Sequence, residues 1–209
     1  MSATRVVPMF PLGAVLFPHA PLPLHVFEPR YRAMVRDLLA GDGEFGVVLI
    51  ERGHEVGGGD VRFSVGTLAR LLQCSRLPDG RYALIAYGTV RIEVRRWLPD
   101  DPYPQAVVAV LGDSPPSEDL AASLARAGDA LARVHTLAAE LDPSFRVPDP
   151  SPLASDPTIA VFELCARAPL GALDMQGLLA ATGAQQRLDA LCTHLDDLTA
   201  ILRARLEGR

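Results

Sequence analysis

The chain has 209 residues and a formal net charge of −5 at pH 7, with 49% hydrophobic and 22% charged residues. This composition excludes a disordered chain and fits one large domain or two small subdomains. All 20 positively charged side chains are arginines, since the sequence contains no lysine, and it contains no asparagine either. These absences exclude a Walker-type phosphate loop, a Schiff-base lysine, a Ser–Lys dyad and a Cys–His–Asn triad.

The acidic balance argues against a broad footprint for phosphate backbones, which normally requires a basic surface. Arginines gather at Arg30, Arg32 and Arg36 and again at Arg91, Arg95 and Arg96, but acidic or apolar residues separate them. We interpret both groups as solvated faces and do not expect nucleic acid as a partner.

The three cysteines are odd in number and far apart, so we expect no disulfide framework and a reducing, cytoplasmic location. Prolines interrupt the apolar N-terminal stretch, and no apolar run approaches the length of a membrane span. We therefore expect no signal peptide and no membrane partner.

The first half of the chain predicts strands. Proline-containing apolar runs predict edge strands at Arg5–Leu12 and Leu22–Phe27, followed by a helix from Pro29 to Gly41. A buried strand is expected at Phe45–Glu51 and a turn at 57–60. Further strands are predicted at Val65–Cys74, Tyr82–Ala86, Val90–Trp97 and Gln105–Leu111, with a turn at Pro78-Asp79-Gly80.

The second half predicts helices after a proline-rich linker at Asp113–Ser117. The first begins at Ser117–Asp119 with a hydroxyl cap, and its apolar stripe runs from Leu120 to Leu141. Gly128 lies inside that stripe, so either a close neighbour packs there or the helix is locally weak. Three more helices are predicted at Thr158–Arg167, Ala172–Ala181 and Gln185–Glu207. We expect two subdomains, a β subdomain at 1–112 with one inserted helix and a helical subdomain at 117–209.

The sequence contains no recognisable catalytic constellation. The glycines of residues 41–46 have GxGxxG spacing, but they follow a helix and precede a strand, which is the reverse of a dinucleotide site. The five histidines form no local ligand set, and Cys192 and His194 fit a buried free cysteine beside an exposed histidine. We expect no metal, no cofactor and no enzymatic activity.

Several motifs together resemble one known family. The stretches Met9–Pro18 (MFPLGAVLFP) and Pro21–Arg32 (PLPLHVFEPRYR) are similar to the N-terminal substrate-binding domain of Lon proteases, above all to its small stand-alone bacterial form. The segments 45–50, 66–70 and 77–91 match in the same order. Near the end of the chain, Gln176, Leu178, Leu179, Arg187, Leu188 and Leu191 match the "Q-x-LL … RL-x-x-L" pattern of that family.

The resemblance implies an α+β fold: a six-stranded, pseudouridine-synthase-and-archaeosine-transglycosylase-like (PUA-like) pseudo-barrel followed by a helical bundle. A full-length Lon continues into ATPase and Ser–Lys protease modules, whereas this chain stops at Arg209 and has no lysine. The expected function is thus non-catalytic recognition of unfolded or tagged polypeptides, by a monomer or weak homodimer. Two alternatives stay open: binding of one dedicated folded partner, and nucleic-acid binding through the barrel face by Arg70, Arg91, Arg95 and Arg96.

The candidate protein-binding residues lie at the N-terminal strands and at the strand–helix corner that follows them. They are Phe10, Phe17, Leu24, Phe27, Glu28, Arg30 and Tyr31. The corner residues have two interpretations. An acid, an arginine and an aromatic ring can grip a peptide. Alternatively, Glu28 favours the helix dipole, Arg30 pairs with a carboxylate and Tyr31 packs in the core, and this structural interpretation is the favoured one.

Overall fold

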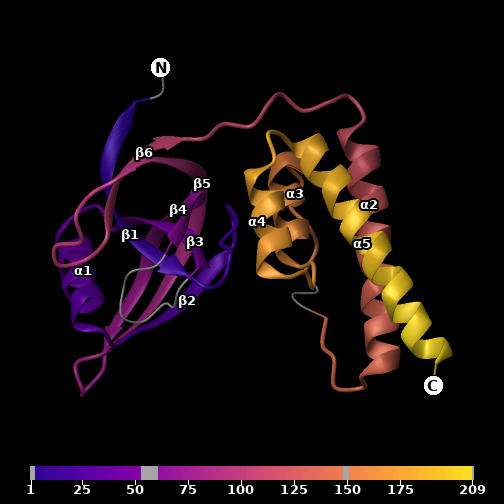
Figure 1. Cartoon of the computed structure of the whole chain (residues 1–209), viewed down its shortest axis with the longest axis horizontal. Coiled ribbons are helices and arrows are strands. Elements are labelled where there is room, and N and C mark those ends of the chain that lie inside the picture. The colour runs from indigo at the N-terminus through magenta and orange to yellow at the C-terminus, as the bar shows by residue number, and fades with distance from the viewer. Residues whose placement is uncertain (1–2, 53–60, 148–150, 209) are drawn as a thin grey trace. The chain divides into compact units, whose positions relative to one another are not determined.

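The computed structural model describes residues 3–52, 61–147 and 151–208, which form two compact units, Met1–Gly112 and Asp113–Arg209 (Figure 1). The turn predicted at 57–60 lies outside the described residues. The first unit comprises β1 (Thr4–Leu12), β2 (Pro21–Val26), α1 (Pro29–Ala40), β3 (Glu44–Arg52), β4 (Val61–Arg76), β5 (Tyr82–Trp97) and β6 (Gln105–Val110). The second comprises α2 (Leu120–Leu141), α3 (Pro157–Ala166), α4 (Ala172–Ala180) and α5 (Ala184–Glu207). The expected α+β class is confirmed.

The sheet has six strands in the order β2-β5-β4-β3-β1-β6, and β6 also pairs with β5. That last pairing closes the sheet on itself, as expected for a pseudo-barrel. β5 makes closure possible because one of its ends pairs with β2 and the other with β6, while β4 runs along most of its length.

The prediction of two separate strands at Tyr82–Ala86 and Val90–Trp97 is wrong, because one strand of 16 residues spans both. Opposite β4 the register shifts between Leu68 and Ala69, so the strand continues through a bulge instead of ending. Gly88 exchanges backbone hydrogen bonds with the loop after β1: its carbonyl accepts from His19 at 2.8 Å and its N–H donates to Ala20 at 2.9 Å. A side chain at Gly88 would overlap the carbonyl oxygen of Phe17, so glycine permits this close approach.

β1 is not an edge strand, contrary to the expectation from its prolines, whereas β2 does lie at the edge. The first half of β1 pairs antiparallel with β6 and its second half pairs parallel with β3. Each proline therefore lies where β1 has one paired neighbour, which is the condition under which a strand tolerates a missing N–H.

Helix α1 covers the core of the first unit. Its buried side chains are Tyr31, Met34, Val35 and Leu38, at the predicted helical spacing. They join a hydrophobic cluster that includes Phe10, Phe45 and Ala69 from three strands. The helix begins at Pro29, as predicted, because proline supplies the helical φ and has no N–H to leave unpaired.

In the second unit, α2 and α5 lie side by side and run in the same direction (Figure 1). Gln185, in the first turn of α5, bonds to Ser117 at 2.9 Å and to Ser123 at 3.0 Å. The expectation that Ser117 caps α2 is wrong. Asp119 occupies the cap position, and its side chain makes no capping hydrogen bond. By contrast Asp156 caps α3 as predicted, accepting a bond from the Thr158 N–H at 2.8 Å.

Arg187 is the central polar residue of the helical unit, with 0% of its surface exposed. Its guanidinium binds both carboxylate oxygens of Asp113, at 3.0 and 3.1 Å, and donates to the carbonyls of Leu178 and Ala181. It also lies over the ring of Phe162, 4.2 Å from the centroid. Asp113, expected in the linker, is therefore the exposed partner of the buried Arg187.

Gly128 is a weak point of α2, because a Cβ at this position would meet no neighbour within 4 Å. We expect Gly128→Ala to raise the free energy of unfolding by about 0.5–1 kcal/mol through better helix propensity. Urea denaturation followed by circular dichroism measures the change. Gly66→Ala is the contrasting variant, since its Cβ would overlap the carbonyl oxygen of Val47; it should lose about 1–3 kcal/mol. Equal effects of the two substitutions would contradict this account.

Asp113→Ala tests the ion pair between the exposed Asp113 and the buried Arg187. Removing the carboxylate leaves the Arg187 charge buried without its counterion, so we expect a loss of about 3 kcal/mol in the free energy of unfolding. Asp197→Ala removes an exposed carboxylate of α5 and should stay within about 0.5 kcal/mol of the parent. A loss at Asp113 no larger than that at Asp197 would show that the pair does not stabilise the unit.

His135 on α2 makes stability depend on pH. Burial lowers the pKa of its imidazole below the usual 6.5, and its Nε2 atom has no hydrogen-bond partner among the described residues. The folded state therefore binds fewer protons than the unfolded state, so stability falls as the pH drops below about 6.5. Between pH 7 and 5, His135→Leu should lose less stability than the parent in parallel urea titrations. Identical pH profiles would rule out this contribution.

Candidate functional site

The candidate site lies at the corner where β2 ends and α1 begins. The last β2–β5 pair joins Val26 to Tyr82, and Glu28 remains extended before Pro29 starts the helix. Phe27 lies between the last paired residue and the helix, with 54% of its surface exposed. Among the exposed large hydrophobic residues that the structure describes, Phe27 is the one aromatic residue, and it makes this corner a candidate interaction surface.

Beside Phe27 is a cavity of about 200 Å³, which we call the Phe27 groove. Its lining consists of Phe10, Leu12, Pro23, Leu24, His25, Val26, Phe27, Glu28 and Tyr31. The volume is below the ~300–1,000 Å³ of typical small-molecule sites. The groove is therefore sized for a single apolar side chain rather than for a cofactor.

Buried aromatic rings form the floor of the groove. Phe10 stacks on Tyr31 with ring centroids 4.2 Å apart and an interplanar angle of 10°, and it contacts Phe45 at 6.4 Å. These rings are held by the core cluster under α1. The floor is consequently preorganised, which lowers the entropic cost of binding.

The charged residues of the corner contact one another. The Arg30 Nε donates to a Glu28 carboxylate oxygen at 3.0 Å, and the Arg30 guanidinium lies 4.6 Å from the centroid of the Tyr31 ring. The Glu28 carboxylate accepts no capping hydrogen bond from a backbone N–H of α1. These contacts match the favoured structural interpretation of Arg30 and Tyr31, and they leave Phe27 as the free aromatic side chain of the corner.

The structure brings several predicted site residues together and separates others. Phe10, Leu24, Phe27, Glu28 and Tyr31 all line the groove. Arg30 is outside the lining and reaches the site through Glu28. Phe17 is 1% exposed and lies in the core, so its side chain is inaccessible to a partner in this conformation.

Sequence reasoning did not single out Leu12, Pro23, His25 or Val26, which also line the groove. The alternating exposure of β2 brings Pro23 and His25 to the accessible side of the edge strand. Period-two patterning along Pro21–Val26 was the signal that could have identified them.

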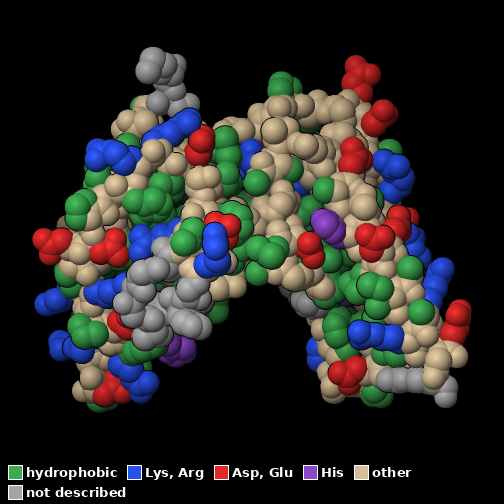
Figure 2. All heavy atoms as spheres, in the orientation of Figure 1, with side chains coloured by type: hydrophobic (Ala, Val, Ile, Leu, Met, Phe, Trp, Pro, Cys, Tyr) green, Lys and Arg blue, Asp and Glu red, His purple; other side chains and the backbone are tan. Residues whose placement is uncertain are grey.

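The arginines of the nucleic-acid alternative do not form a free basic patch. Arg91 is 3% exposed and donates to the Gly112 carbonyl, so it cannot share an exposed surface. Arg70 pairs with Glu44 at 2.8 Å and Arg95 with Glu93 at 3.0 Å. Figure 2 shows acidic and basic side chains interspersed over the visible face. These contacts engage three of the four arginines of that alternative and reduce the positive charge available to a phosphate backbone, whereas Arg96 is exposed.

Nothing in the described ranges gathers three or more metal-competent side chains. The expectation of a buried Cys192 beside an exposed His194 is wrong, because both residues are half-buried on α5. Cys165 is the buried thiol, and burial raises its pKa to about 12, which makes it a poor nucleophile.

A family model described as the ATP-dependent protease La (LON) substrate-binding domain matches residues 6–197. The chain belongs to this family. The match extends over both compact units, from β1 into α5. This chain is thus a substrate-binding module of the LON type.

Curated relatives match about half of the chain. A Lon protease of Cytophaga hutchinsonii is 35% identical over 114 residues, 53% of this chain and 14% of the relative. Lon protease 2 of Myxococcus xanthus is 31% identical over 119 residues, 56% of this chain and 14% of the relative. The matched part therefore spans about a seventh of the length of these proteases.

Two solved structures share the fold. The Lon N-terminal domain protein from Xanthomonas campestris has a TM-score of 0.64 and 25% identity, covering 90% of this chain and 98% of that one. The N-terminal domain of a Mycobacterium avium complex Lon protease has a TM-score of 0.63 and 19% identity, covering 94% and 98% respectively. In the parts of this LON domain that the structure describes, no helix has the length and apolar character needed to cross a bilayer.

Proposed function

We propose that this LON domain is a non-catalytic polypeptide-binding module that takes an apolar side chain of an unfolded or tagged client into the Phe27 groove. The observation that carries the proposal is the 54% exposure of Phe27 beside a cavity floored by the stacked Phe10 and Tyr31 rings. An exposed aromatic next to a preorganised apolar hollow is the arrangement that peptide-binding hot spots use.

Side-chain capture, rather than strand addition, is the mode that β2 favours. β2 is the edge strand of the sheet, and edge strands can accept an additional strand from a ligand. Pro21 and Pro23 lack an N–H, however, so this edge offers few backbone donors. We therefore assign most of the affinity to apolar contacts in the groove.

The cysteines support a proposal about the cellular setting of the module. The three cysteines are free, which suits a reducing compartment such as the cytoplasm. We propose that the module acts there on protein or peptide clients, as a monomer or a weak homodimer, without a cofactor.

Binding to an unfolded client tests the proposal. Reduced, carbamidomethylated α-lactalbumin cannot refold and serves as the probe, with native α-lactalbumin for comparison. Phe27→Ser should weaken binding of the unfolded probe about tenfold, as loss of a hot-spot aromatic does. Biolayer interferometry measures the affinity. Leu72→Ser, which removes another exposed apolar side chain of the same unit, is the matched control and should leave affinity unchanged.

Two results would overturn the proposal. Equal losses at Phe27 and Leu72 would remove the groove as the binding site. No binding of the unfolded probe, together with one stoichiometric folded protein recovered from cell lysate, would make the module a dedicated interaction domain.

A further inference from the structure

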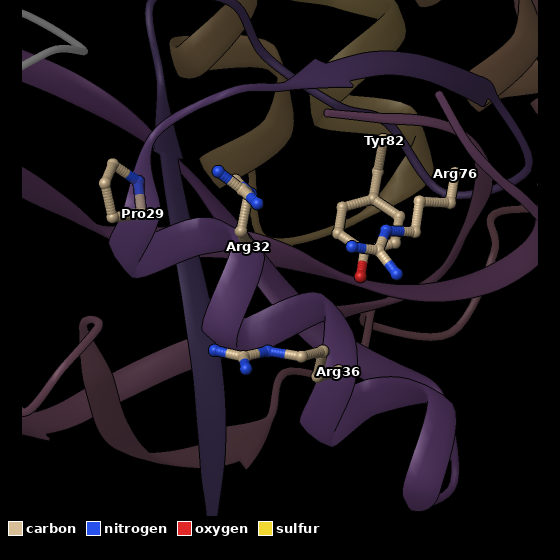
Figure 3. Close-up of a pocket in the computed structure, with 5 residues that line it drawn as sticks. All are labelled: Pro29, Arg32, Arg36, Arg76 and Tyr82. Atoms are coloured by element: carbon tan, nitrogen blue, oxygen red, sulfur yellow. The ribbon is translucent and has the colours of Figure 1, made fainter. Parts of the chain in front are cut away.

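A second hollow, of about 420 Å³, lies on the other side of the same corner; we call it the arginine pocket. It is lined by Pro29, Arg32, Arg36, Arg76 and Tyr82. Figure 3 shows Arg32 and Arg36 on successive turns of α1 and Arg76 and Tyr82 on the neighbouring strands. The register places Arg76, at the end of β4, opposite Tyr82, at the start of β5.

The three arginines of this pocket have no carboxylate partner within the residues that the structure describes. Their neighbours differ: Arg30 pairs with Glu28 at 3.0 Å, and Arg81 pairs with Asp79 at 2.7 Å. The carboxylates of Glu28 and Asp79 are thus engaged by other arginines, and Asp37, next to Arg36 in the chain, accepts a hydrogen bond from Tyr103 at 2.8 Å. Three guanidinium groups around one concavity without a counterion form a site for an anionic group.

The turn between β4 and β5 positions one wall of the pocket. Gly80 adopts a φ of 81°, and a Cβ there would lie 2.8 Å from a terminal nitrogen of Arg32. The absence of a side chain at Gly80 therefore lets the Arg32 guanidinium lie against the turn. Because α1 and the turn both belong to the first unit, this wall is part of the folded framework.

The two hollows share the segment that joins β2 to α1. Phe27, Glu28 and Tyr31 line the groove, while Pro29 and Arg32 line the arginine pocket. Glu28 and Pro29 are neighbours in the chain and line different hollows, so the two hollows meet at this segment, and an extended client advances about 3.3 Å per residue. One short client segment can therefore reach both hollows.

Building on the proposed function, we propose that the arginine pocket binds the carboxylate of an aspartate or glutamate of the client polypeptide whose apolar side chain occupies the Phe27 groove. Guanidinium groups bind carboxylates through paired, charge-assisted hydrogen bonds, which matches the chemistry of the pocket. The chain's net charge of −5 and the paired arginines elsewhere favour a local acidic group over an extended nucleic acid. The preferred client therefore combines an apolar residue with an acidic residue a few positions away.

The test uses fluorescent peptides that carry one phenylalanine and one glutamate, spaced one to four residues apart, each paired with its Glu→Gln analogue. At the best spacing, the parent protein should bind the glutamate peptide about tenfold more tightly than the glutamine peptide. The double variant Arg32→Gln/Arg76→Gln should abolish this ratio while still binding the glutamine peptide. Arg96→Gln, at an exposed β5 position outside the pocket lining, should preserve it. The ratio should also fall in high salt, because exposed charges are screened.

The failures are distinguishable. If the parent binds both peptides of each pair equally, or if the double variant keeps the preference, the acidic-residue proposal is overturned and the apolar groove stands. If neither peptide binds to folded protein, checked by circular dichroism for every variant, the proposed function fails and this inference fails with it. If a single-stranded RNA oligonucleotide, but no glutamate peptide, loses affinity in the double variant, the pocket serves nucleic acid and the proposal is wrong.

Discussion

The helical unit depends on one buried cation. Arg187 has no exposed surface, and its guanidinium donates four hydrogen bonds, two to the Asp113 carboxylate and two to backbone carbonyls, and lies over the ring of Phe162. Burying the Arg187 charge without a partner would cost several kcal/mol. The folded unit therefore requires Asp113, the two carbonyls and Phe162 to lie around the guanidinium. The ion pair therefore specifies where the chain segment before α2, the turn after α4 and the face of α3 must lie.

The first unit depends instead on glycines at positions where its backbone segments approach too closely for a side chain. Gly66 and Gly88 lie where a Cβ would overlap a backbone oxygen, so the strands and the loop after β1 approach one another more closely than other residues would allow. Val47, against which Gly66 packs, belongs to the same hydrophobic cluster as the Phe10 and Tyr31 rings of the groove. The exposed Phe27 follows from the same geometry, because β2 ends its pairing one residue earlier and α1 begins two residues later.

The sequence predicts correctly those features that depend on residues close together in the chain. Helix α1 followed from the spacing of its apolar residues and from Pro29, and the cap at Asp156 followed from its sequence context. The length of β5 was missed because Gly88 resembles a strand end, whereas its backbone continues the ladder. The position of β1 was missed because prolines suggested an edge, and only the pairing with two different strands explains their tolerance.

Non-local contacts set the limit of prediction for the site. The corner motif drew attention to Phe27 and Tyr31, but no periodicity shows that Phe10 stacks on Tyr31 from another strand. The arginine pocket is likewise not predictable from the sequence pattern, because Arg76 and Arg32 are far apart in the chain and line one pocket only in the folded unit. Asp113 has the sequence context of a linker, and its partner Arg187 lies 74 residues further along the chain.

The pairing of β1 with β6 has a consequence for biosynthesis. Within its unit β1 is synthesised before the other strands and β6 after them, yet Thr4 to Pro8 pair only with β6 among the described strands. This half of β1 therefore stays unpaired until more than a hundred residues have been translated. An apolar edge left open for that time is a site for misassociation on the ribosome. Pro8, which has no backbone N–H, removes one hydrogen-bond donor from this unpaired half of β1.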